Sequence, residues 1–152
     1  MRSNLDDKSA LLVLRMILFS CALFVLLAGI GAAFLVPTAT DAARLGLEKL
    51  AIVAAVCSPL AILVIVIGKN YLNGLLERQT GESKIQTLIG GATLLAGICE
   101  APGLLWAFCA YLLNEPLYAI GSVAHAIGIL FLWPDGSELG NGNDVTIAEG
   151  DG

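Results

Sequence analysis

Four long stretches of this chain carry almost no charge, and their lengths constrain the fold more than any other feature. They hold 21, 18, 29 and 17 residues and run over 16–36, 50–67, 85–113 and 117–133. A helix that crosses the hydrocarbon core of a bilayer, about 30 Å thick, needs roughly 17–25 residues. All four stretches reach this length, the fourth only just. The pattern therefore predicts four membrane-crossing helices.

The composition agrees with this interpretation. Hydrophobic residues make up 57% of the chain and charged residues only 14%, whereas a soluble domain usually carries about 25% charged residues. The period-two alternation that is typical of membrane β-strands is absent. We therefore expect an all-α fold, an integral membrane four-helix up-and-down bundle. Its spans are expected at about 10–36, 50–68, 85–113 and 117–133.

The bundle is expected to have short polar flanks on either side. Residues 1–9 form a polar N-terminal lead, 10–133 the transmembrane domain, and 134–152 an acidic tail. Five acids and no base lie beyond Trp133. Because the tail is also rich in Gly and Asn, we expect it to be disordered. Its acidity argues against nucleic acid as a partner.

Prolines mark turns and bends in the predicted helices. Helices three and four are joined by Asn114-Glu115-Pro116 alone, and so short a link predicts an antiparallel hairpin, with Pro116 in the first turn of the fourth helix. Pro59 and Pro102 fall in the middle of the second and third runs. Each frees the carbonyl group four residues earlier, and each predicts a kink.

The distribution of Lys and Arg predicts the orientation. With four spans, the N-terminus, the middle loop and the C-terminus share one side of the membrane. That side holds six basic residues, and the opposite side holds only Arg44 and Lys49. Since basic residues favour the cytoplasmic side, both termini are expected in the cytoplasm, most simply at a bacterial inner membrane. The six are Arg2, Lys8, Arg15, Lys69, Arg78 and Lys84.

Sequence motifs for catalysis, metal or cofactor binding are not found. The four cysteines, Cys21, Cys57, Cys99 and Cys109, all fall inside the apolar runs, and none forms C-x-x-C. We interpret them as small packing residues. A phosphate loop, an H-E-x-x-H pair and a nucleophile elbow are also missing. We therefore expect a protein that is not an enzyme and has no metal or cofactor.

Glu100 is the one charged residue in the four runs, which makes it the leading site candidate. A charge at the bilayer centre costs on the order of 2.5–3.5 kcal/mol on insertion scales. Steps of three or four along the helix place small residues, including Gly90, Gly97 and Gly103, on the face of Glu100. Small residues let helices approach closely in lipid, so Glu100 is expected to face another helix. Gly121 and Gly128 indicate a similar face of small residues on the fourth helix.

Two partners are predicted for Glu100. Ser58, beside Pro59, lies at the same depth in the second run, so the two helices could enclose a polar pocket at mid-membrane. His125 lies about 7.5 Å from Glu100 along the bundle axis, within reach of a bridging water. Two roles remain open for Glu100: a protonated carboxyl group that fixes helix packing, or a proton or cation site.

The third run also carries two family resemblances. The Arg78-Gln79 loop, Lys84-Ile85 and Glu100-Ala101 resemble the carboxylate-bearing helix of rotary-ATPase c subunits. That resemblance implies ion binding at Glu100. Residues 84–133 also resemble small four-span bacterial membrane proteins with Glu-Ala-Pro in a middle helix, which implies the fold and no particular activity.

The functional expectation is a small multipass membrane protein. It would act by helix packing, as a self-associating or accessory subunit, with the lipid bilayer and other membrane subunits or further copies of itself as partners. The alternative is translocation of a proton or cation through Glu100.

Overall fold

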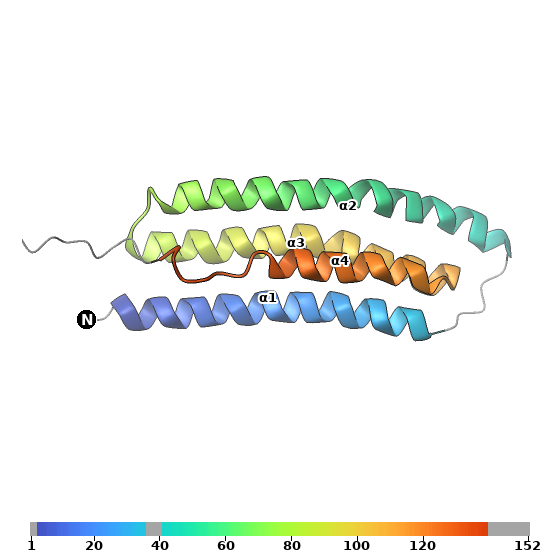
Figure 1. The fold of residues 1–152 in the computed structure, drawn as a ribbon, viewed down its shortest axis with the longest axis horizontal. Helices are drawn as coiled ribbons and strands as arrows, with labels where there is room; N and C mark the ends of the chain where they lie inside the picture. Colours follow the sequence, from blue (N-terminus) through green and yellow to red (C-terminus); the bar gives the residue numbers. More distant parts are fainter. Residues whose placement is uncertain (1–2, 36–40, 140–152) are drawn as a thin grey trace, which may run out of the picture.

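The computed structural model describes residues 3–35 and 41–139, which fold almost entirely as helices (Figure 1). The expected all-α fold is confirmed, and no strand occurs in these two ranges. The expected polar lead, residues 1–9, is not separate from the first helix, because that helix already begins at Ser3. The elements are α1 (Ser3–Phe34), α2 (Asp41–Leu76), α3 (Gly81–Leu113), the 3₁₀ helix η1 (Pro116–Tyr118) and α4 (Ala119–Leu130).

The helix α3 is the centre of the bundle. It packs against α1, α2 and α4, and α4 also packs against α1. Successive helices run in opposite directions, but α1 and α2 are not neighbours, because α3 and α4 lie between them (Figure 1). Glycines allow close contact between α2 and α3: a Cβ at Gly68 would overlap Leu95, and a Cβ at Gly91 would lie 2.6 Å from a methyl carbon of Leu72.

The outer surface of the bundle is strongly apolar, while its interior contains many small residues. Leu14, Leu18 and Ile129 are fully buried, and Ala96 and Cys99 fill the narrower spaces between helices. Large hydrophobic side chains on all four helices point outward, which is unusual for a soluble protein and typical of a lipid-facing surface. Among the most exposed are Met16, Phe34, Ile52, Leu94, Leu117 and Ile120.

Three helical segments are long and apolar enough to cross a bilayer, judged by length and composition. They are Lys8–Phe34, Glu48–Leu76 and Gly81–Leu113, and each contains an 18-residue stretch with a mean hydropathy of 2.7, 3.0 and 1.6, respectively. The fourth predicted span is shorter than expected, since its helical part covers only Pro116–Leu130. Beyond Leu130 the chain turns at Phe131 and Leu132.

Both internal prolines are accommodated within continuous helices. Pro59 lies inside α2 and Pro102 inside α3, and neither ends its helix. At the hairpin between α3 and α4, Asn114 adopts a left-handed conformation with φ 52° and Pro116 opens η1. The short turn and the place of Pro116 therefore match the expectation.

Residues 131–139 form a strap that continues from the end of α4 along the bundle, toward the end where α1 and α3 begin (Figure 1). Lys69 Nζ donates a hydrogen bond to the carbonyl oxygen of Phe131 at 2.7 Å, and Arg15 donates two to that of Pro134 at 2.9 and 3.2 Å. Pro134 is buried, and Leu139 packs against the core. Residues 134–139 of the expected tail thus contact the bundle, and its remainder lies outside the described residues.

Candidate functional site

Two of the predicted site residues, Ser58 and His125, meet inside the bundle. The Nε2 atom of His125 lies 2.9 Å from the hydroxyl oxygen of Ser58. That hydroxyl group donates a hydrogen bond to the carbonyl oxygen of Ala54 at 2.7 Å and accepts one from the indole N–H of Trp106, also at 2.7 Å. Ser58 is thus the meeting point for polar groups from α2, α3 and α4.

The other side of the imidazole ring contacts Cys99 of α3. The Cys99 sulfur lies 3.3 Å from Nδ1 of His125 and 3.3 Å from the carbonyl oxygen of the same residue. Cys99 and His125 are 0% and 1% exposed, whereas Ser58 and Trp106 are half-buried. The four side chains therefore form a polar chain, which we call the His125 network, with a closed inner end and an outer end at Ser58 and Trp106.

Three glycines provide the space for this network. A Cβ at Gly128 would lie 3.0 Å from the Cys99 sulfur, and one at Gly121 would overlap the indole ring of Trp106. At Gly103 a Cβ would lie 2.9 Å from the Cβ of His125. The Trp106 ring also stacks on Tyr118, with 5.6 Å between ring centroids. The close approach of α3 and α4 therefore depends on these three predicted packing positions.

Glu100 lies outside the His125 network. It is half-buried, and its carboxyl group hydrogen-bonds with the thiol of Cys21 on α1. The reason is helical geometry: each residue turns by about 100°, so Glu100 points away from the face on which its neighbour Cys99 meets α4. The pocket that was expected between Glu100, Ser58 and His125 therefore does not form in the described chain, although Glu100 does face another helix.

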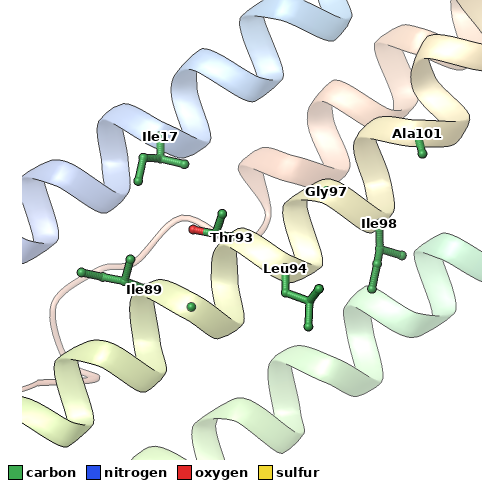
Figure 2. A pocket seen from close by; sticks show the side chains of 8 residues that line it. Ile17, Ile89, Thr93, Leu94, Gly97, Ile98 and Ala101 are labelled. Carbon is green, nitrogen blue, oxygen red and sulfur yellow. The ribbon is translucent and has the colours of Figure 1, made fainter.

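The two remaining predicted packing glycines, Gly90 and Gly97, have no neighbour from another described helix. A Cβ at either position would meet nothing within 4 Å. They lie on an exposed side of α3, in a shallow, almost entirely apolar groove that Ile17 of α1 borders (Figure 2). The groove is lined by Ile17, Ile89, Gly90, Thr93, Leu94, Gly97, Ile98 and Ala101.

No protein family, curated protein or solved structure matches this chain.

The Ser58–His125 pair has the spacing of an activated serine nucleophile, but its surroundings do not suit that chemistry. Ser58 Oγ is bonded to its own Cβ and has three hydrogen-bond partners, Ala54, Trp106 and His125. The Cβ atom and these three partners occupy all four tetrahedral positions around the oxygen, so no lone pair remains for an electrophile. In the described ranges no three metal-ligating side chains cluster either.

Cys99 and Trp106 are the site residues that the sequence reasoning missed. Together with Gly103 they follow the spacing i, i+4 and i+7, which places them on one face of a helix. The sequence contains that signal, because a cysteine, a glycine and a tryptophan on one helical face suggest close packing around a ring.

Proposed function

We propose that this chain is a small multipass integral membrane protein that associates with a second copy of itself through the exposed small-residue face of α3. That surface, called here the α3 face, consists of Gly90, Thr93, Gly97 and Ala101. The observation that carries the proposal is that Gly90 and Gly97 have no neighbour within 4 Å, while Gly103, Gly121 and Gly128 each contact another helix.

Membrane insertion is supported by the outward-facing apolar side chains and by the position of two basic residues along the bundle axis. Arg15 and Lys69 lie at one end of the apolar segments, next to the rings of Trp133 and Phe131 at 5.9 and 4.6 Å. Aromatic and basic residues at a shared level are typical of the membrane–water interface. The excess of Lys and Arg on this side supports cytoplasmic termini, and a bacterial inner membrane is the setting we propose.

Small residues on a lipid-exposed face favour helix association for a physical reason. Lipid tails are as apolar as leucine, so burial of apolar surface gives little driving force, and close van der Waals packing of backbones decides the contact. On the α3 face, the glycines leave the backbone of α3 open to a neighbouring helix. A small-residue face without an internal partner therefore favours a second copy as its occupant.

The test is dimer formation in liposomes, measured by single-molecule photobleaching as the protein is diluted into lipid. The parent chain is expected to form dimers, and Gly97→Leu is expected to weaken them at least tenfold, because its side chain blocks close approach. Gly74→Leu is the matched control, since Gly74 of α2 also has nothing within 4 Å and lies away from the groove.

Two results would contradict the proposal. One is a parent chain that stays monomeric at every density. The other is a Gly97→Leu variant that dimerises like the parent. Cross-linking to a different membrane protein, with no homodimer, would replace self-association by an accessory role.

A further inference from the structure

We infer that His125 is a proton-binding site, because the His125 network has one hydrogen too few when the imidazole ring is neutral. The inference concerns the buried ring and its partners, and it does not depend on association through the α3 face.

The His125 network contains five polar contacts. Ser58 contacts the carbonyl of Ala54, Trp106 contacts Ser58, and Nε2 of His125 contacts Ser58. The Cys99 sulfur contacts both Nδ1 and the carbonyl oxygen of His125. Each contact needs a hydrogen of its own. Trp106, Ser58 and Cys99 supply one each, and a neutral imidazole supplies a fourth.

A neutral ring therefore leaves one contact unmade, whichever nitrogen carries the hydrogen. With the hydrogen on Nε2, Ser58 can still donate to Ala54, but Nδ1 must accept the thiol hydrogen of Cys99, and the bond to the carbonyl of His125 is lost. With the hydrogen on Nδ1, Nε2 must accept from Ser58, and the bond to Ala54 is lost.

The charged imidazolium form completes all five contacts. Nε2–H donates to Ser58, which accepts from Trp106 with its second lone pair and donates to Ala54. Nδ1–H donates to the Cys99 sulfur, while the thiol hydrogen points to the carbonyl oxygen of His125. Hydrogen bonds from a charged donor are about twice as strong as neutral ones, which offsets part of the cost of a buried charge.

The surroundings determine which groups take part in the titration. From α3 the titratable group that faces the ring is Cys99, and from α2 the facing group is Ser58, which does not titrate. From α1 the residue nearest to Gly103, beside the ring, is the apolar Val25, which does not titrate. The carboxyl group of Glu100 interacts with Cys21 of α1 and not with the ring. In the described ranges no carboxylate hydrogen-bonds with the His125 ring.

The test uses the fact that the chain contains a single histidine. Protein labelled with ¹⁵N-histidine is placed in lipid bilayers, and the ring nitrogen signals are followed by solid-state NMR from about pH 8 to about pH 4, a range that spans ordinary histidine titration. The parent is expected to convert from a neutral ring to imidazolium within this range.

Variants of Cys99 test the role of the sulfur. Cys99→Ala is expected to lower the titration midpoint by about one pH unit or more, because Nδ1–H then has no acceptor. Cys99→Ser restores an acceptor and a donor and is expected to return the midpoint toward that of the parent. Cys109→Ala is the matched control, since Cys109 is also buried in α3 but packs with Ala51 and Leu113 in a separate cluster.

Either of two outcomes would overturn the inference: a parent ring that stays neutral throughout the range, or a Cys99→Ala midpoint equal to that of the parent. If Cys99→Ala does not fold, as judged by circular dichroism, the parent titration and the Cys99→Ser variant decide the matter.

Discussion

The imidazole Nε2 of His125 and the hydroxyl oxygen of Ser58 lie 2.9 Å apart, although 67 residues separate them in the chain. This contact joins α4 to α2, two helices that otherwise touch over only a small area. A second link joins α2 to the strap that follows α4, at one end of the bundle, where Lys69 binds the carbonyl oxygen of Phe131. The position of α2 in the bundle therefore depends on α3 and on two polar contacts with the α4 segment.

Ser58→Ala is expected to destabilise the bundle. The change removes the partner of the Trp106 indole N–H and of the His125 ring, and a buried group without a partner costs about 1–3 kcal/mol. The free energy of unfolding, measured by titration with SDS in mixed micelles, should fall by that amount. Ser20→Ala on the exposed side of α1 is the control, and an equal loss in both variants would refute the role of the contact.

Alanine at two glycines of α3 should have opposite effects. At Gly103 a Cβ would lie 2.7 Å from a methyl carbon of Val25 and 2.9 Å from the Cβ of His125, so Gly103→Ala should destabilise the fold by about 1–3 kcal/mol. At Gly97 the space is open, so Gly97→Ala should leave stability unchanged or raise it by up to about 1 kcal/mol. The same SDS titration measures both, and similar losses would contradict this assignment of the two glycines.

The strap should loosen in acid through Asp135. Hydrogen bonds from Ser137, then a hydrogen bond with Glu138 and last the nearby charge of Lys69 hold the pKa of Asp135 below its ordinary value of 3.8. Since the folded pKa is lowered, the contribution to stability is present above that ordinary value and is lost as the pH falls through the folded pKa.

An NMR titration of the Asp135 carboxyl carbon measures this effect. Ser137→Ala should raise the midpoint more than Lys69→Met does, because the hydroxyl group of Ser137 is the largest influence on the carboxylate. The reverse order would show that the charge of Lys69 dominates.

Glu100→Gln is expected to preserve both fold and association. The amide oxygen can still accept a hydrogen bond from Cys21, so the contact between α1 and α3 remains. Proton flux into proteoliposomes should be the same for the variant and the parent. If the parent conducts protons and Glu100→Gln does not, Glu100 is an ion carrier, and translocation replaces packing as its role.

The positions of the helices could be predicted from the sequence because uncharged runs of membrane-spanning length leave the backbone few alternatives. The end of α4 could not. The apolar run continues to Trp133, but the helix stops at Leu130. Beyond it the N–H groups of Leu132 and Trp133 bond to carbonyl groups three residues back, and cations from α1 and α2 bind the carbonyl groups of Phe131 and Pro134. Arg15 and Lys69 are distant in sequence, and the run itself carries no sign of them.

Of the four members of the candidate site, Ser58 and His125 were predicted from the sequence, whereas Cys99, Trp106 and the arrangement of the site were not. Helical periodicity places Gly97 and Glu100 on related faces, and depth brings Ser58 to the right level. Rotation about the helix axis decides the rest: Cys99 meets α4, its neighbour Glu100 meets α1, and Gly97 meets neither. Which helices lie beside α3 is a property of the whole bundle, and local sequence does not contain it.

The separation of α1 from α2 bears on how the protein is made. Most helical hairpins can close as soon as both arms have entered the membrane. Here the first two arms border a space that residues 81–113 must later fill, so we expect them to stay apart in lipid until synthesis of the third arm is complete. Until α3 has entered the membrane, the nascent chain would therefore hold two helices without a shared interface, open to proteases and membrane chaperones.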